Sequence, residues 1–211
     1  MKAIVIGATG AVGQDLVKTL LYDDRYETVT TFTRRPLGFT HPKIQSFIVD
    51  FNLPDTWHHL VQGDVLFSAL GTSLKQAGSK EAQYRVDHDY QLSFARAARE
   101  NGVPHMVLVS SVGADSSSRF FYLQLKGLIE KDVEALQFPS LTILRPPSLI
   151  RKHAKRPTET VSVRLLHLAS SLGLCKAMAP VPTESVARKM ADEGAHPSEG
   201  VKILSAQETR G

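Results

Sequence analysis

Short apolar runs alternate with amphipathic stretches along most of the chain. Residues 2–7 are β-branched and apolar and end in glycine, and residues 11–21 carry apolar positions at helical spacing, so a strand, a glycine turn and a helix are predicted. Further strands are predicted at 28–33, 44–49, 65–70, 105–111, 141–144 and 201–204. Helices are predicted at roughly 55–61, 79–101, 120–137 and 184–193.

Most of the predicted strands are apolar on both faces. Such strands, alternating with helices, are typical of a parallel sheet that helices cover on two sides. Residues 148–182 break the alternation, because they are first basic, then amphipathic and then interrupted by prolines. We interpret this segment as a small C-terminal cap over the carboxyl edge of the sheet, on the substrate side. The sequence therefore predicts an α/β fold with a cap.

The length of 211 residues predicts a single domain over 1–211. Hydrophobic residues make up 42% and charged residues 22%, which is ordinary globular usage and excludes a disordered or collagen-like chain. The longest largely apolar stretch, 3–13, is broken by glycines and is shorter than the roughly 18 residues that a membrane span requires. No charged leader precedes it, so we predict no secretory signal and a mature protein that starts near Met1.

The net charge and the number of cysteines limit the classes of ligand and the cellular compartments to be considered. The formal net charge of +4, from 25 basic and 21 acidic residues, suits an anionic small molecule and does not require nucleic acid. Cys175 is the only cysteine, which excludes an internal disulfide and favours a reducing compartment. The eight histidines lack metal-site spacing, so we assign no metal. On these grounds we expect a cytoplasmic protein, monomeric or homodimeric, without a membrane span.

Three glycines stand between the first predicted strand and the first helix, in the segment Gly7-Ala-Thr-Gly10-Ala-Val-Gly13. Glycine permits a tight turn and a close approach of the backbone to a pyrophosphate, and the helix N-terminus adds free N–H donors. A tight turn without a ligand is the alternative, but the position between strand and helix favours a dinucleotide site. The residues assigned to the cofactor here are Gly7, Thr9, Gly10, Ala11, Val12 and Gly13.

The second predicted strand ends in Thr33-Arg34-Arg35-Pro36. NAD enzymes carry an acidic residue near this place, which binds the ribose hydroxyl of the adenosine. Here two guanidinium groups replace it, and the planar donor fork of arginine suits the 2′-phosphate of NADP(H). The alternative is a solvated basic turn. We predict NADP(H) as the cofactor.

A second group of polar residues follows the fifth strand. Ser110 and Ser111 end that strand, and Tyr122 and Lys126 lie one turn apart on the next predicted helix, where positions i and i+4 share a face. Such a tyrosine can act as an acid/base with the nearby ammonium tuning it, and a serine hydroxyl can orient a substrate oxygen. Lys126 could also hold the nicotinamide ribose. The alternative is an ordinary pair on a helix surface.

Together these motifs resemble the atypical short-chain dehydrogenase/reductase family and, more narrowly, its Tat-interacting-protein-like subgroup. The resemblance covers residues 1–150 and implies a Rossmann-type, doubly wound parallel sheet of about seven strands that binds NADP. Its blocks are Gly7-Ala-Thr-Gly10, Leu70-Gly71-Thr72, Val86-Asp-His-Asp-Tyr90, Ser110-Ser111-Val-Gly-Ala-Asp115 and Phe121-Tyr-Leu-Gln-Leu-Lys-Gly127.

The resemblance also implies cofactor contacts at the ends of later strands. It assigns Asp50 and Phe51, after the third strand, to the adenine side, and Leu70 and Gly71, after the fourth, to the adenosine side. It places the backbone of Pro146 beside the nicotinamide. For Asp50, a polar strand end or a helix cap is the alternative.

Two positions depart from the pattern of the family. Asp87 stands where many catalytic members have an asparagine that anchors a proton-relay water, and Pro147 stands where a glycine is usual. The sequence therefore lacks the asparagine of the relay, and the proline removes a backbone donor near the carboxamide of the nicotinamide.

The segment after the sixth strand leaves three interpretations open. Residues 151–156 are basic, and 161–174 carry apolar residues on one helical face. This stretch could cap a substrate pocket, contact an anionic membrane surface or a partner, or form a solvated loop and helix.

Two functions remain open on this sequence. The first is an NADPH-dependent reductase or dehydrogenase for a small carbonyl or alcohol, with Tyr122 as acid/base, Lys126 as its tuner and Ser111, or else Ser110, orienting the substrate. The second is a noncatalytic redox sensor whose partner binding depends on NADPH. The intact Ser, Tyr and Lys set favours the enzyme.

Overall fold

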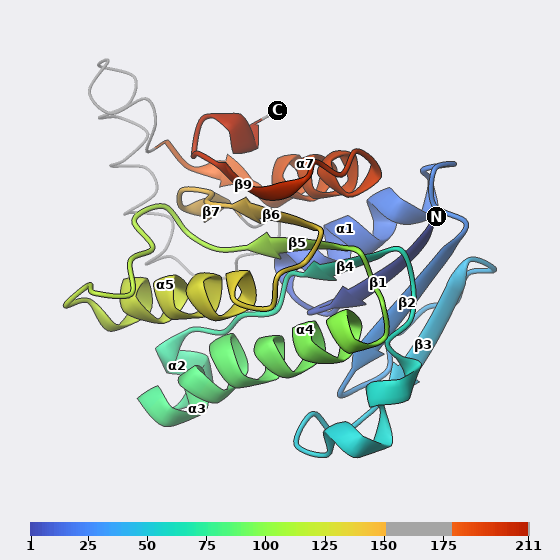
Figure 1. Ribbon diagram of the computed structural model, residues 1–211, viewed down its shortest axis with the longest axis horizontal. Coiled ribbons are helices and arrows are strands. Elements are labelled where there is room, and N and C mark those ends of the chain that lie inside the picture. Colours follow the sequence, from blue (N-terminus) through green and yellow to red (C-terminus); the bar gives the residue numbers. More distant parts are fainter. Residues whose placement is uncertain (151–178, 211) are drawn as a thin grey trace.

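The computed structural model describes residues 1–150 and 179–210, which form a central sheet with helices on both faces (Figure 1). The strands lie in the order β3-β2-β1-β4-β5-β6-β9, and every neighbouring pair is parallel. This arrangement confirms the predicted Rossmann-type sheet of seven strands. Its strands are β1 (Lys2–Ile6), β2 (Thr28–Thr33), β3 (Ile44–Ile48), β4 (Val65–Ser68), β5 (His105–Val109), β6 (Ser140–Leu144) and β9 (Gly200–Leu204).

The sheet separates two hydrophobic cores. Helices α1 (Ala11–Leu21) and α7 (Thr183–Ala195) cover one face, and α4 (Tyr90–Glu100) and α5 (Phe121–Glu134) cover the other (Figure 1). Successive residues of a strand point to opposite faces, so β1 contributes to both cores. Its residues Ala3 and Val5 pack with α1 and α7, and Ile4 and Ile6 pack with α4 and α5.

The order of the strands places a crevice at the carboxyl end of β1. From β1 the chain continues through β2 and β3 to one edge of the sheet, and it then returns to β4 on the other side of β1. The connections after β1 and β4 therefore run to opposite faces, and in open parallel sheets ligands bind at such a reversal. The segments after β1 and β4, which begin at Gly7 and Ala69, flank this crevice.

Two predicted helices differ from the structure. Residues 55–61 form two 3₁₀ turns, Pro54–Thr56 and His58–Leu60, rather than a helix. They are separated by Trp57, whose buried ring stacks on Phe94 at 3.9 Å between centroids, so tertiary packing interrupts the segment. The helix predicted over 79–101 is divided into α3 (Lys80–Tyr84) and α4 by a π-helical turn, Arg85–Asp89.

Three short elements were not predicted. A four-residue helix, α2 (Leu74–Ala77), follows β4, and β7 (Leu149–Ile150) pairs in parallel with β8 (Val181–Pro182). The segment predicted as a cap, 148–182, lies mostly outside the described residues, and the basic and amphipathic stretches within it lie wholly outside them. In the described ranges, no helix is long and apolar enough to cross a membrane.

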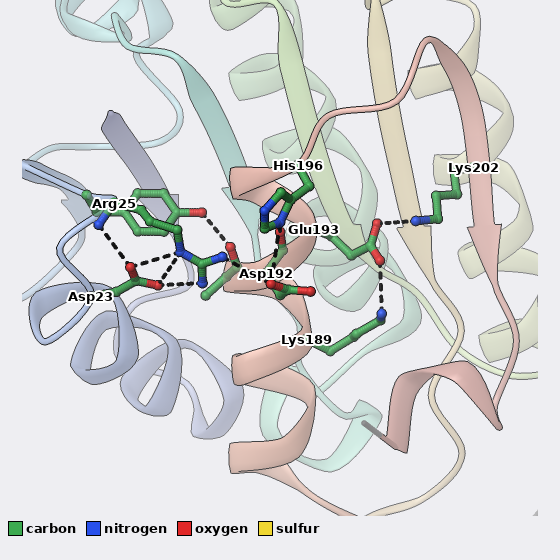
Figure 2. Close-up of polar contacts among 9 residues, drawn as sticks. Asp23, Arg25, Lys189, Asp192, Glu193, His196 and Lys202 are labelled. Carbon is green, nitrogen blue, oxygen red and sulfur yellow. Dashed lines mark hydrogen bonds and ion pairs between the residues drawn. The ribbon is translucent and has the colours of Figure 1, made fainter.

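Ion pairs connect α7 to β9 and to the segment after α1, near the amino-terminal ends of the strands (Figure 2). The carboxylate of Glu193, largely buried, lies 3.0 Å from the Lys189 ammonium and 2.7 Å from that of Lys202 on β9. Burial raises its pKa, but the two lysines outweigh burial and hold the pKa of Glu193 below its ordinary value. Next to this cluster, the Arg25 guanidinium bridges Asp23 and Asp192. These contacts fix the helix that covers β4 and β5 on one face.

A buried histidine in β5 makes stability depend on pH. His105 is 2% exposed, and its Nε2 lies 3.4 Å from the Thr142 hydroxyl on β6. Burial lowers the pKa of His105 from 6.5 to about 4, because the imidazolium loses its hydration in the core. The folded protein therefore holds this side chain neutral at pH values at which the unfolded chain binds a proton.

We expect the free energy of unfolding to fall as the pH is lowered from 6.5 to about 4, since only the unfolded state takes up the His105 proton there. The loss attributable to this residue is on the order of 3 kcal/mol. Urea unfolding at a series of pH values should show a flatter dependence in His105→Gln than in the wild type. His59→Gln, which changes an exposed histidine, is the control. An equally steep dependence in His105→Gln would contradict the assignment.

Candidate functional site

Close backbone contacts fix the glycine turn after β1. Gly7 has φ +81°, in the left-handed region, and a Cβ there would overlap the backbone of Ala69 and Leu70 after β4. A Cβ at Gly13 would overlap the carbonyl oxygen of Gly7. Both positions therefore require glycine for the fold itself. Gly10 differs, since its φ is −78° and its Cβ would lie 3.2 Å from the nearest atom, the Gly7 oxygen.

The N-terminus of α1 points donors into the crevice. Gly10 is the N-cap and supplies no side-chain acceptor, and the first turn contains no acidic residue. The first-turn amides of Ala11, Val12 and Gly13 have no helical carbonyl to accept their hydrogen bonds. Together with the partial positive charge of an eleven-residue helix, they form a site for an anion such as a pyrophosphate.

Two neighbouring cavities lie along this turn. The first has a volume of about 550 Å³ and the second of about 430 Å³, and Leu70 lines both. Among the predicted site residues, the first cavity is lined by Gly10, Ala11, Val12, Gly71, Ser110, Tyr122 and Lys126. Those that line the second are Gly7, Thr9, Arg34, Arg35 and Phe51. Gly13 lines neither, because it packs against Gly7 beneath the turn.

The second cavity brings the predicted basic pair to the end of β2. Arg34 and Arg35 are exposed, and neither makes a hydrogen bond or ion pair to another residue of the described ranges. The Thr33 hydroxyl beside them is buried and likewise lacks a partner there. Phe51, which is 4% exposed, supplies an apolar wall. The cavity thus combines free cations, an unused hydroxyl and an aromatic ring.

Asp50 does not line this cavity. Its Oδ1 accepts hydrogen bonds from the backbone N–H of Asn52 at 2.9 Å and from the Asn52 side chain at 2.8 Å. These hydrogen bonds lower the pKa of Asp50. The carboxylate therefore serves a local turn at the end of β3, and the structure favours the alternative of a polar strand end over the predicted adenine contact.

The two serines after β5 have different surroundings. Ser110 lines the first cavity, and its hydroxyl is buried and has no hydrogen-bond partner within the described residues. Ser111 lines neither cavity, and its hydroxyl donates to the carbonyl of Val112 at 3.3 Å. Of the two candidate serines, only Ser110 therefore lines the cavity.

Helix α5 carries Tyr122 and Lys126 to the same cavity. A Cβ at Gly127 would overlap the backbone of Asp115 and Ser116, so the helix lies directly against the loop that follows Ser110. The backbone N–H of Asp115 donates to the Leu123 carbonyl at 3.1 Å in the same contact. Tyr122 is 43% exposed at the mouth of the cavity, and Lys126 is 4% exposed within it.

Lys126 is paired with Asp87, the residue that departs from the family pattern. The Lys126 Nζ lies 3.6 Å from Oδ1 of Asp87, which is 1% exposed on the π-helical turn and lines the first cavity. Both carboxylate oxygens lie 3.1 Å from the Thr72 backbone N–H. Burial raises the pKa of Asp87, and the Lys126 ammonium opposes that shift.

Pro146 lies outside both cavities. It is buried, and its carbonyl accepts a hydrogen bond from the Val112 N–H at 3.0 Å, so its oxygen is engaged with the loop after β5. The preceding Arg145 pairs with Glu130 of α5, with Nη2 and Oε2 2.5 Å apart. The predicted contact of Pro146 with the cofactor is therefore not supported by its position.

Several lining residues were missed by the sequence argument. Among them, Leu74, Lys80, Gln83 and Phe121 form part of the wall of the first cavity, and the Lys80 ammonium lies 5.4 Å from the centre of the Phe121 ring. The segment that contains the first three follows β4 and carries no recognisable motif. No group of three or more His, Cys, Asp or Glu side chains in the described ranges could hold a metal ion.

Comparisons with known proteins agree with this geometry. A family model described as "NAD(P)H-binding" matches residues 7–197. Protein FMP52, mitochondrial, of Debaryomyces hansenii is 38% identical over 162 residues, which are 74% of this chain and 70% of that protein. Protein HTATIP2 of Rattus norvegicus is 39% identical over 160 residues, which are 74% of this chain and 66% of that protein.

A solved structure supports the fold. The short-chain dehydrogenase/reductase superfamily protein from Agrobacterium tumefaciens, with bound NAD, superposes with a TM-score of 0.74 over 99% of this chain and 78% of that one, at 16% identity. The relative from Rattus norvegicus confirms the resemblance to the Tat-interacting-protein-like subgroup, and the solved structure confirms the fold. A nicotinamide dinucleotide is supported by these findings, whereas the choice between NAD and NADP is not decided by them.

The expectation of a cytoplasmic protein is wrong on these findings. The FMP52 relatives from Debaryomyces hansenii, Saccharomyces cerevisiae and Meyerozyma guilliermondii all carry the word mitochondrial in their names. The expectation rested on a single cysteine, Cys175, and on the lack of a recognisable leader. A single cysteine indicates a reducing compartment and does not say which one.

Substitutions at two glycines of the turn should distinguish effects on stability from effects on cofactor binding. Gly13→Val should lower stability by more than about 3 kcal/mol, because its side chain would overlap the Gly7 carbonyl. Gly10→Val should lose less stability but weaken binding of NADH or NADPH at least about 100-fold, since its side chain occupies the cavity. Thermal unfolding and calorimetric titration measure the two effects. Normal binding by folded Gly10→Val would place the cofactor elsewhere.

Proposed function

Because the chain belongs to the NAD(P)H-binding family, we propose that it is an NADPH-dependent oxidoreductase that interconverts a small carbonyl compound and its alcohol. The observation that carries the proposal is the convergence of Ser110, Tyr122 and Lys126 on one cavity, which the N-terminus of α1 also lines. A single bound molecule could then contact a proton donor (Tyr122), a hydroxyl that binds its oxygen (Ser110), a cation (Lys126) and the anion site of α1.

A dinucleotide phosphate fits the residues that are present. The amides of Ala11 and Val12 would hold the pyrophosphate, and the second cavity beside Phe51 would take the adenosine. The nicotinamide half would enter the first cavity, where Lys126 would bind the ribose. Each cavity also contains one buried hydroxyl without a partner in the described residues, that of Thr33 or Ser110, and a polar ligand would satisfy both.

The chemistry follows from these positions. When bound, NADPH supplies a hydride to the carbonyl carbon of the substrate. The Ser110 hydroxyl donates a hydrogen bond to the substrate oxygen and orients it, and the Tyr122 hydroxyl donates the proton that this oxygen needs. The Lys126 ammonium, one helical turn away, stabilises the negative charge that remains on the phenolic oxygen. Oxidation of the alcohol uses the same groups in reverse.

Preference for NADPH rests on the two arginines. Arg34 and Arg35 line the second cavity without partners in the described ranges, so their donors are free for a 2′-phosphate. No carboxylate lines this cavity, which removes the group that would hold a free ribose hydroxyl. These observations support NADPH over NADH.

A regulatory function is the second candidate. The pairing of Lys126 with Asp87 favours it, because a carboxylate beside the ammonium reduces the positive charge available to Tyr122. In that case the protein binds NADPH, does not turn it over, and changes its affinity for a partner.

The cofactor preference is testable by calorimetric titration with NADPH and NADH. NADPH should bind about tenfold to a hundredfold more tightly, since charge-assisted hydrogen bonds to a phosphate contribute on that scale. The double variant Arg34→Ala with Arg35→Ala should bind the two cofactors with similar affinity. Arg96→Ala, which removes an exposed arginine of α4 away from both cavities, is the matched control. Equal affinities in the wild type would contradict the assignment.

The enzyme and the regulator are distinguished by Tyr122→Phe, which keeps the ring and removes the proton donor. NADPH absorbance is followed over a panel of quinones, aldehydes and ketones. The enzyme proposal expects turnover by the wild type, a loss of at least about 100-fold in Tyr122→Phe, and unchanged NADPH affinity. Tyr22→Phe, at an exposed tyrosine distant from the cavities, should keep full activity.

Two other outcomes of this assay would contradict different parts of the enzyme proposal. Turnover that Tyr122→Phe leaves unchanged would refute the role of Tyr122. NADPH binding without turnover of any compound in the panel would favour the regulator.

A further inference from the structure

Three charged side chains line the first cavity in the described part of the chain, namely Lys80, Asp87 and Lys126. Lys80 is exposed at the mouth, where its ammonium lies over the Phe121 ring. Asp87 and Lys126 are 1% and 4% exposed, so water screens them poorly. The charge deep inside the cavity is therefore set by this buried pair.

The polar groups around Asp87 oppose the effect of burial on its carboxylate. Both carboxylate oxygens lie 3.1 Å from the Thr72 backbone N–H, and the Lys126 ammonium lies 3.6 Å from Oδ1. A Cβ at Gly71 would come within 2.9 Å of the same oxygen, so this glycine leaves the room that the carboxylate occupies. Burial is the largest influence and raises the pKa of Asp87, while the Lys126 ammonium and the Thr72 N–H oppose that shift by stabilising the charged carboxylate.

The position of Asp87 is fixed by its own turn. Its backbone carbonyl accepts a hydrogen bond from the Gln91 side chain at 2.6 Å, and the Gln91 amide oxygen accepts one from the Ser68 hydroxyl at the end of β4. Lys126 has no other hydrogen bond or ion pair within the described ranges. Its remaining donors are therefore available to a ligand while the ion pair persists.

Oxidised and reduced cofactor differ by one charge, because the nicotinamide ring is cationic in NADP⁺ and neutral in NADPH. We propose that Asp87 sets the relative affinity of the site for these two forms, by cancelling the Lys126 charge beside the nicotinamide and so permitting NADP⁺ to bind. The inference rests on the proposed function, in which the nicotinamide enters the first cavity.

The size of the effect follows from the size of the cavity. A volume of about 550 Å³ corresponds to a space roughly 10 Å across, so a ring within it lies near the carboxylate, and an effective dielectric constant of about 20 applies. Removal of the carboxylate leaves two cations, Lys80 and Lys126, lining the cavity. NADP⁺ should then bind roughly tenfold more weakly relative to NADPH.

The test is the ratio of the dissociation constants for NADP⁺ and NADPH, measured by calorimetric titration near neutral pH in the wild type and in Asp87→Asn. The ratio should rise roughly tenfold in the variant. Asp89→Asn is the matched control, because Asp89 lies on the same turn, pairs with His88 and lines neither cavity. Its ratio should equal that of the wild type.

A purely structural role of Asp87 predicts a different result, since a damaged site loses affinity for both cofactors in equal measure. An unchanged ratio in Asp87→Asn would therefore overturn the inference and leave the proposed function intact. Failure of the wild type to bind either cofactor would overturn the proposed function itself. Should Asp87→Asn not fold, Asp87→Ser makes the same charge change and leaves room for water beside the ammonium; the same rise in the ratio is expected.

Discussion

The contact of the α1 backbone with the turn after β1 is the constraint on which the site depends. Gly13 lies against the Gly7 carbonyl, and Gly7 in turn lies against the backbone of Ala69 and Leu70. No side chain fits between these segments, so the helix N-terminus is fixed at the crevice beside β1 and β4. The donors of α1 and the loop after β4 thus face the same space, and the two cavities adjoin at Leu70.

A second close backbone contact, between α5 and the loop after β5, positions the polar side chains of the first cavity. Gly127 lets α5 lie on the loop after β5, which brings Tyr122 and Lys126 to the cavity that Ser110 enters from the sheet. The buried Lys126 needs a counter-charge, because an unpaired ammonium in the interior is costly. Asp87 supplies it from the π-helical turn. The paired charges of Asp87 and Lys126 leave the interior of the first cavity nearly neutral, whereas Arg34 and Arg35 line the second cavity as cations that are unpaired within the described residues. This distribution suits a ligand with a nicotinamide ring at one end and a phosphate at the other.

Patterns that act locally could be predicted from the sequence, and contacts between distant segments could not. The strand, glycine turn and helix at the start follow from neighbouring residues, and so does the alternation that gives seven parallel strands. The sequence left both Ser110 and Ser111 open, because which of them lines the cavity depends on the path of the chain after β5. The sequence did not reveal that the Asp50 carboxylate accepts hydrogen bonds from Asn52, two residues away, and lines neither cavity. The pairing of Asp87 with Lys126 requires a π-helical turn that apolar periodicity does not reveal.

The central claim is that the nicotinamide of NADP(H) lies in the first cavity, within reach of Ser110 and Tyr122. A crystal structure of the complex with NADP⁺ tests it most directly. The account predicts the ring in that cavity, the pyrophosphate on the amides of α1, and the 2′-phosphate beside Arg34 and Arg35. A dinucleotide bound elsewhere on the molecule would contradict it, and so would a nicotinamide ring too far from Tyr122 for one small substrate to contact both.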